Sequence, residues 1–288
     1  NFGTQANSEI PNDEYWLDVG GELSNQVFDH HFSDSPFKST AEIITNCIKK
    51  LSTLSCADEI TLVLHQMPDL DGIYSSWLFE TAINNPEKAQ SKYCEILSNL
   101  VTLHDQGFED QFEVESSWPI IFYMELSSRL NVYDNDHQRI KVGHTIIDET
   151  FTLLNRDLSI EKVAKLLLSE NNTKELTKIK NAYQQDISKA SIFQIKLPST
   201  NNAKELLKVD AIALTNPKTA GLLKHFARRD KKHSPSNSGF TLLVVSKSVD
   251  IEDPTPRWRH IISVKPEAGV SLVGLGKALE MAEQDKEN

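Results

Sequence analysis

The spacing of apolar residues indicates short buried strands near the start of the chain, followed by a helix. Residues 15–17 and 27–28 are apolar runs that each end at an aspartate, and Gly20 favours a turn between them. Residues 39–50 place isoleucine and cysteine at helical spacing behind a serine or threonine cap and an early glutamate. This combination predicts a helix with a defined start.

The alternation continues through the most hydrophobic run of the first half. Residues 59–64 predict a strand, residues 65–72 a polar loop, and residues 73–82 a second helix. Such repetition is typical of an α/β fold with a mainly parallel sheet covered by helices, in which ligands bind beyond the carboxyl ends of the strands. We therefore expect functional residues at those strand ends.

The rest of the chain predicts a helical stretch and then a second, smaller α/β domain. Residues 118–190 carry apolar positions at helical spacing and no distinctive chemistry. We expect a first domain over 1–190, helical in its second half, and a smaller C-terminal α/β domain over 191–288. The elements expected in the second domain are strands over 209–214, 241–246 and 260–264 and helices over 219–226 and 274–283.

The composition is that of a folded, acidic protein. Hydrophobic residues make up 39% of the 288 residues and charged residues 25%, which leaves ample apolar surface to bury. The formal net charge of −11 repels a long polyanion from most of the surface. A nucleic-acid substrate therefore has to meet a local basic patch or metal ions, and a short nucleotide suits this charge better than a long duplex.

Cysteine use and hydropathy favour a reducing compartment. Cys47, Cys56 and Cys94 lack the close spacing of a zinc or redox motif, so we expect free thiols. No apolar run approaches the roughly 20 residues of a membrane span, and the polar start is unlike a signal peptide. These patterns predict a cytoplasmic protein with no membrane partner, and they leave its oligomeric state open.

A first candidate site is the triplet Asp29-His30-His31, which stands where a predicted strand gives way to a loop. Carboxylate and imidazole together bind manganese, magnesium or zinc, and adjacent side chains can divide between a metal and a substrate oxygen. Three polar residues after a strand are more often only a turn. The triplet therefore needs a second group beside it to indicate a site.

That second group is His65, Asp69 and Asp71, which follow the most hydrophobic strand of the first half. Two carboxylates two residues apart, with an imidazole four residues before the first, can supply ligands to two neighbouring cations. Pro68 and Gly72 shape the loop. The alternative is an ordinary turn rich in aspartate and glycine.

Two further aspartates, Asp18 and Asp105, each follow an apolar stretch and come shortly before a glycine. Alone, each is more often a capping or turn residue. If all four sites meet at one sheet edge, their carboxylates repel one another unless cations neutralise them. We therefore predict a metal site at that edge.

With these motifs the chain resembles the DHH phosphoesterases, a family named for the triplet seen here as Asp29-His30-His31. The similarity is close over residues 14–110 and looser elsewhere. The family includes RecJ-like exonucleases, nanoRNases, cyclic-dinucleotide phosphodiesterases and manganese inorganic pyrophosphatases. The resemblance implies a sheet domain carrying two manganese ions, for which magnesium can substitute, joined to a smaller C-terminal domain that binds substrate.

The resemblance also implies a role for each residue of the candidate site. His31 would face the phosphate, and Asp29 would orient the histidines, so these two would have the catalytic roles. The implied metal ligands divide between two ions that share one carboxylate: His65 and Asp69 for the first ion, His30, Asp71 and Asp105 for the second, and Asp18 for both.

Two features depart from the family pattern. The His-x-x-x-Asp-x-Asp motif normally precedes the triplet, whereas residues 65–71 follow it here. Loops at strand ends can converge in any chain order, and the alternative is that Asp69 and Asp71 are incidental. The glycine-rich Gly-Gly-His substrate motif is absent, and residues 269–276 are its nearest counterpart.

Basic residues in the last third of the acidic chain are the expected substrate contacts. Arginine binds phosphate through two N–H groups, and a tryptophan among these residues could stack on a base. A solvated basic surface is the alternative. The expected contacts are Lys224, Arg228, Arg229, Arg257 and Arg259.

These expectations describe a two-metal phosphoesterase that hydrolyses phosphodiester bonds of short oligonucleotides or small nucleotides. A manganese inorganic pyrophosphatase or polyphosphatase is the alternative among enzymes. A regulatory or scaffold protein that keeps the fold without turnover is an alternative of another class. It predicts weak metal binding and no activity lost on Asp71→Ala.

Overall fold

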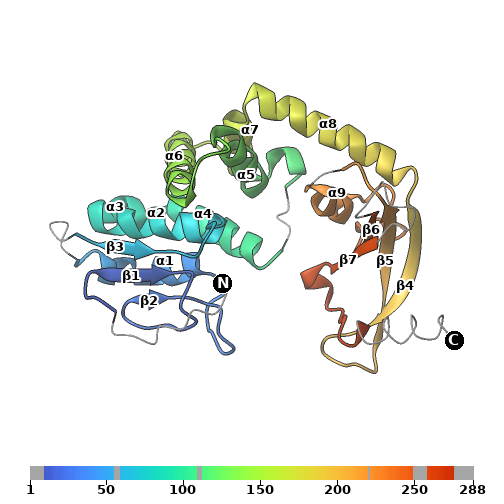
Figure 1. Cartoon of the computed structure of the whole chain (residues 1–288), viewed down its shortest axis with the longest axis horizontal. Helices are drawn as coiled ribbons and strands as arrows, with labels where there is room; N and C mark the ends of the chain where they lie inside the picture. Colours follow the sequence, from blue (N-terminus) through green and yellow to red (C-terminus); the bar gives the residue numbers. More distant parts are fainter. Residues whose placement is uncertain (1–9, 55–58, 109–111, 220, 249–257, 276–288) are drawn as a thin grey trace. The chain divides into compact units, whose positions relative to one another are not determined.

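The computed structural model describes residues 10–54, 59–108, 112–219, 221–248 and 258–275. The chain forms two compact units, residues 1–176 and 177–288. Each unit combines a β-sheet with helices (Figure 1), so the protein has an α/β fold, as the sequence predicts. The first unit ends within helix α8 (Glu170–Ile187), whereas the sequence places the domain boundary after residue 190.

A three-stranded parallel sheet opens the first unit. β1 (Glu14–Leu17) lies in the middle, between β2 (Val27–Phe28) and β3 (Thr61–Val63). Trp16 is in register with Val27 on one side and with Val63 on the other. Because the three strands are parallel, their carboxyl ends share one edge of the sheet, and the loops that follow them begin there.

Helices follow the sheet in the first unit, and the first of them begins with the cap that the sequence indicates. The Ser39 side chain accepts a hydrogen bond from the Glu42 amide at the start of α1. The Asp69 side chain caps α2, which begins at Leu70, earlier than the expected start at residue 73. The helices are α1 (Thr40–Leu51), α2 (Leu70–Asn84), α3 (Pro86–Ala89), α4 (Lys92–Asp105), α5 (Trp118–Arg129), α6 (Asp136–Leu154), α7 (Ile160–Leu167) and the 3-10 turn Val114–Ser116.

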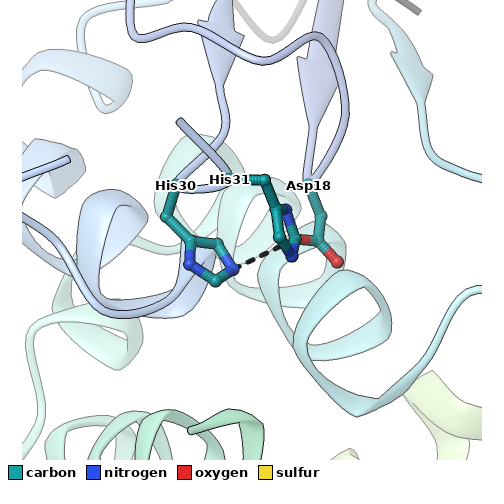
Figure 2. Close-up of side chains that lie close together, drawn as sticks. All are labelled: Asp18, His30 and His31. Atoms are coloured by element: carbon teal, nitrogen blue, oxygen red, sulfur yellow. Dashed lines mark ion pairs between the residues drawn. The ribbon is translucent and has the colours of Figure 1, made fainter. Parts of the chain in front are cut away.

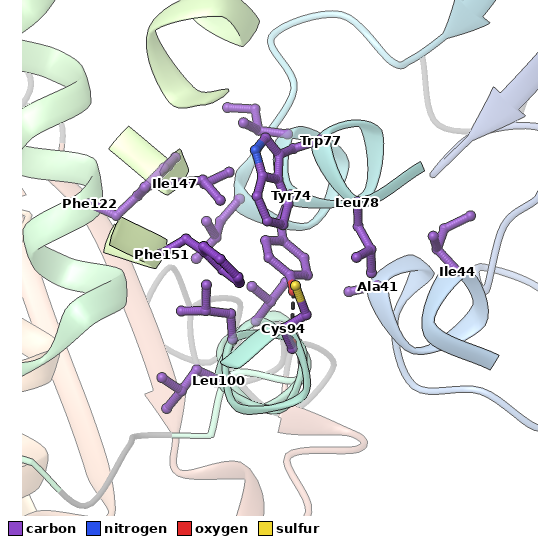
Figure 3. Packing of buried hydrophobic residues seen from close by; sticks show 14 of the residues in the cluster. Ala41, Ile44, Tyr74, Trp77, Leu78, Cys94, Leu100, Phe122, Ile147 and Phe151 are labelled. Atoms are coloured by element: carbon purple, nitrogen blue, oxygen red, sulfur yellow. Dashed lines mark hydrogen bonds between the residues drawn. The ribbon is translucent and has the colours of Figure 1, made fainter. Parts of the chain in front are cut away.

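Helix α2 lies at the centre of the core. Its side chains are buried on nearly every side, as expected of a helix that packs against neighbours all round. Leu78 lies toward α1, and Trp77 packs on Phe151 of α6 (Figure 3). The Tyr74 hydroxyl donates a hydrogen bond to the Cys94 carbonyl of α4. This packing fixes the direction of α2 and therefore the position of its first turn.

The expected position of Asp105 at the end of a strand is wrong. Cys94, Leu97 and Val101 recur three and four residues apart and form the buried face of helix α4. Asp105 is the last residue of that helix. The apolar stretch before it therefore has the helical period and not the alternation of a strand.

The second unit contains a mixed four-stranded sheet in the order β4-β5-β6-β7. The β5–β6 pair is parallel, and the two outer pairs are antiparallel. The elements are β4 (Ser191–Pro198), β5 (Leu206–Thr215), α9 (Leu223–Arg229), β6 (Leu242–Ser248), β7 (Trp258–Val264) and the 3-10 turn Pro266–Ala268.

Sequence reasoning did not predict the edge strand β4. No strand was expected over 191–198, although Phe193, Ile195 and Leu197 alternate with polar residues there. Helix α9 begins at Leu223, later than the expected start at residue 219. Most of the helix expected over 274–283 lies outside the described residues.

Candidate metal centre

Two of the candidate carboxylates stand directly after neighbouring strands. Asp18 follows β1 and Asp29 follows β2, and both are almost fully buried. Asp18 has a φ of 60°, a left-handed conformation that is uncommon for residues other than glycine. Such conformations cost free energy and occur often at functional sites. The Gly21 amide donates to Oδ2 of Asp29 at 2.7 Å, which fixes the second carboxylate.

Two further candidate carboxylates lie at the start of helix α2. Asp69 accepts hydrogen bonds from the amides of Asp71 and Gly72. Asp71 is buried, and its two oxygens accept from the Thr40 and Ala41 amides at 2.7 and 2.8 Å. These amides open helix α1, where the helix dipole favours a negative charge. The buried carboxylate of Asp71, which belongs to the first turn of α2, is therefore held by the first turn of α1.

Helix α6 holds the loop that carries His65 and Asp69. The Met67 amide donates to Asp136 at 3.0 Å, and Nε of Arg139 donates to the Pro68 carbonyl at 2.7 Å. Met67 has a φ of 52°, so this short loop is strained as well as clamped.

The structure brings together all six residues expected as metal ligands, and His31 with them. Their ligand atoms form three overlapping groups, each within 4.8 Å: Asp18 with His30 and His31, Asp18 with His65 and Asp69, and His30 with Asp71 and Asp105. We call these seven residues the Asp/His cluster. Figure 2 shows the first group, with the His30 and His31 rings turned toward the Asp18 carboxylate.

Asp18 connects the two sides of the cluster. Its Oδ1 lies 3.5 Å from Nε2 of His30, and its Oδ2 lies 3.3 Å from Nε2 of His65. The same Nε2 atom of His30 lies 3.6 Å from Asp71 and 3.4 Å from Asp105. One carboxylate thus faces a different imidazole with each oxygen.

Asp29 stays outside the three ligand groups and holds His31. Its Oδ1 lies 2.8 Å from Nδ1 of His31 and accepts the His31 backbone amide at 3.0 Å. The hydrogen bond with Asp29 raises the pKa of His31. Burial alone would raise the pKa of Asp29, but its bonds with His31 and Gly21 lower it. The charged carboxylate of Asp29 therefore orients the half-exposed imidazole of His31.

The negative charges of the cluster are unequally stabilised. Burial opposes ionisation of Asp18, but the imidazoles of His30 and His65 beside it bring its pKa well below the usual range. Burial raises the pKa of Asp71 well above its usual value, and the charges of Asp18 and Asp105 add to this. Burial also raises the pKa of Asp105 to about 6. Ionisation of one carboxylate therefore opposes ionisation of the others, because like charges raise the pKa of neighbouring carboxyl groups.

The donor set fits a divalent cation. Nε2 of His30 is buried and has no hydrogen-bond partner among the described residues, although three carboxylates surround it. A buried imidazole nitrogen without a partner is costly, and a cation among carboxylates and imidazoles would satisfy it. The buried Asp and His groups are close enough to hold a metal ion.

The basic residues expected to contact substrate have different environments. Arg228 is buried and donates to the Ser263 hydroxyl and the Val264 carbonyl of β7, so its guanidinium ties α9 to the sheet. Arg229 donates to the His225 carbonyl within its own helix. Lys224 and Arg259 are exposed. Arg257 lies outside the described residues.

Several residues around the cluster escaped sequence reasoning. The Thr40 hydroxyl donates to Oδ1 of Asp18 at 3.2 Å, and the Tyr123 hydroxyl accepts the Leu70 amide at the start of α2. Thr40 was within reach of sequence reasoning, because it belongs to a helix start and such starts bind anions. Tyr123 and Arg139 come from distant helices, and no local signal connects them to the cluster.

Comparison of the chain with models of protein families, with curated proteins and with solved structures finds no match. None of the described helices combines the length and the apolar character needed to cross a membrane.

Proposed function

We propose that this protein is a two-metal phosphoesterase that hydrolyses phosphodiester bonds of short oligonucleotides or small nucleotides. The observation that carries the proposal is the position of Asp18, with one oxygen facing His30 and the other facing His65. Asp69 completes the group around His65, and Asp71 and Asp105 complete the group around His30. A shared carboxylate between two ligand groups is the arrangement expected of two neighbouring cations.

Manganese is the cation that we propose for both groups. Mixed carboxylate and imidazole ligands suit manganese, and magnesium could replace it. When bound, the two ions supply positive charge to the phosphoryl oxygens and lower the pKa of water.

The residues of the chain contribute position and proton control. The helix α1 amides fix Asp71, so its carboxylate is held in place before any substrate arrives. Asp29 fixes the ring of His31, whose side chain is 40% exposed. We propose that this imidazole donates a hydrogen bond to a phosphoryl oxygen of the substrate, since its raised pKa favours the protonated form.

The substrate class follows from charge. The net charge of −11 disfavours a long polyanion, and a short nucleotide presents few phosphates. Arg228 is not proposed as a phosphate contact, because its guanidinium is already bonded to β7.

A panel of substrates tests the proposal. Short RNA, short DNA, a cyclic dinucleotide and pyrophosphate would be incubated with the protein and manganese, beside the Asp71→Ala and His30→Ala variants. Asp34→Ala is the matched control, since Asp34 is an exposed carboxylate that follows the same triplet. Circular dichroism of each variant shows whether it is folded.

We expect release of nucleotides by the wild type and by the control, and its loss in both cluster variants. Preferred cleavage of pyrophosphate would replace the substrate class with that of a pyrophosphatase. Absence of both manganese binding and cleavage of every substrate would leave a protein without turnover and would overturn the proposal.

A further inference from the structure

One face of the sheet in the second unit bears a cavity of about 520 Å³ beside helix α9. Leu243 and Val245 of β6 and Ile261 of β7 form its apolar floor. Val245 pairs with Ile261, and Leu243 pairs with Ser263, so these side chains point to the same face of the sheet. The volume falls within the roughly 300–1,000 Å³ of small-molecule sites.

The rim of this cavity is basic. Lys224 of α9 and Lys247 of β6 belong to the lining, in which the described residues include no carboxylate. Arg259 pairs with Lys247 across the strands and therefore lies on the same face. Among the described residues, no carboxylate forms an ion pair with Lys224, Lys247 or Arg259. In a chain of net charge −11, this local excess of positive charge favours an anionic ligand.

A buried arginine prepares a hydroxyl of the lining for such a ligand. Arg228 is 5% exposed, and its Nη2 donates to Oγ of Ser263 at 3.0 Å. Because Oγ of Ser263 accepts this bond, the Ser263 O–H can donate into the cavity. A hydroxyl donor below two lysine ammonium groups is suited to a carboxylate or phosphate.

We propose that this cavity binds a small organic anion with an apolar body. The anionic group would contact Lys224, Lys247 and Ser263, and the apolar body would lie on the floor of Leu243, Val245 and Ile261. The cavity lies wholly within the second unit and shares no residue with the Asp/His cluster. The inference therefore stands independently of the proposed hydrolysis.

Two sources of this chemistry are a nucleoside monophosphate and a medium-chain carboxylate. Isothermal titration of the whole 288-residue chain, with EDTA present, would use adenosine monophosphate, octanoate and inorganic phosphate as probes. We expect one of the two organic anions to bind with one site per chain, and inorganic phosphate to bind at least roughly tenfold more weakly because it lacks an apolar body.

Variants of the rim identify the site. Lys247→Gln and Lys224→Gln should each raise the dissociation constant of the bound organic anion by roughly fivefold to tenfold. Lys204→Gln is the control, since Lys204 is an exposed lysine of the same unit outside the cavity. Ile261→Asp places a carboxylate on the floor at a position that is 46% exposed, and it should abolish binding without unfolding the protein.

Several results would overturn the proposal. The proposal is wrong if neither organic anion binds at millimolar concentration. It is also wrong if inorganic phosphate binds with the same affinity as the organic anion. Loss of binding in the Asp18→Asn variant would place the ligand at the Asp/His cluster instead of the cavity. Failure of the phosphoesterase assay, by contrast, leaves every outcome of this titration unchanged.

Discussion

Nε2 of His65 lies 3.3 Å from Oδ2 of Asp18, although the two residues belong to loops after different strands. The sheet explains this distance. Trp16 of β1 is in register with Val63 of β3. Asp18 stands two positions after Trp16, and His65 stands two positions after Val63. Parallel strands in register therefore deliver the two side chains to one edge, and the order of the motifs along the chain has no influence on their meeting.

The central position of Asp18 gives the first prediction. Asp18→Asn should weaken manganese binding by at least roughly 100-fold, because the amide keeps only one oxygen and no charge, and the loss of an outer partner alone costs roughly 10–100-fold. Manganese should raise the melting temperature of the wild type by mass action and should no longer raise that of the variant. Titration calorimetry and thermal unfolding measure the two effects.

Asp34→Asn is the control for this prediction, since Asp34 is exposed and outside the cluster. If Asp18→Asn keeps wild-type affinity for manganese, the cluster does not form the proposed centre.

The clamp on the loop of His65 and Asp69 gives a second prediction. Arg139→Met keeps much of the side-chain length but removes the donor to the Pro68 carbonyl. The loop then holds its ligands less rigidly, and manganese affinity should fall by roughly tenfold with little change in overall stability. Lys141→Met, an exposed neighbour on the same helix, should leave the affinity unchanged. Equal affinities for both variants would show that the clamp is dispensable.

The sequence carries enough local signal to predict much of the candidate site. The strands that end at Asp18 and Asp29, and the capped helix after His31, follow from apolar runs and from the caps. Asp105 was wrongly expected at the end of a strand, although the apolar residues before it recur at the helical spacing of α4. Contacts such as that of Arg139 with Pro68 join residues 71 positions apart. A pattern read along the chain contains no information about such pairs.

One strand of the second unit was missed although the sequence carries a local signal for it. In β4 the apolar residues Phe193, Ile195 and Leu197 alternate with polar ones, which is the pattern typical of a strand. The strand pairs with β5 in antiparallel register over eight consecutive residue pairs. Periodicity therefore indicates the strand, but its partner and register depend on long-range hydrogen bonding that no local pattern contains.

A glycine in the second unit gives a third prediction. Gly239 has a φ of 85°, and a Cβ atom placed there would lie 1.9 Å from the Arg228 carbonyl oxygen. Gly239→Ala therefore combines an unfavourable backbone conformation with a backbone clash, and should lower the free energy of unfolding by more than about 3 kcal/mol. Chemical denaturation measures the loss.

Gly274 supplies the matched control for that substitution. Its φ is 84°, but a Cβ atom there would meet no atom of the described residues within 4 Å. Gly274→Ala should therefore cost only the conformational part, about 1 kcal/mol. Similar losses in the two variants would contradict the clash with Arg228.

His144 of helix α6 gives a prediction about pH that is separate from the cluster. Burial lowers the pKa of His144 to about 4, although the charge of Asp148 acts in the opposite direction. Its Nε2 lies 2.9 Å from the Ser76 hydroxyl, and its Nδ1 lies 3.6 Å from Glu80. The folded protein therefore holds this imidazole neutral over a pH range in which the unfolded chain protonates it.

The sign of the effect follows from this difference. The unfolded imidazole binds a proton below its ordinary pKa of 6.5, whereas the folded one does so only near 4. As the pH falls between these values, the unfolded state gains protons and the free energy of unfolding decreases, by about 1.4 kcal/mol per pH unit for one group. The contribution of His144 should be fully present above pH 6.5 and lost toward pH 4.

A pair of histidine variants isolates this contribution. Denaturant unfolding from pH 7.5 to 4.5 would compare the wild type with His144→Gln and with His137→Gln, which alters an exposed histidine of the same helix. The His144→Gln protein should lose stability less steeply below pH 6.5 than the wild type does. The His137→Gln protein should follow the wild type, because its imidazole is exposed in both states. If all three curves run parallel, burial does not hold His144 neutral.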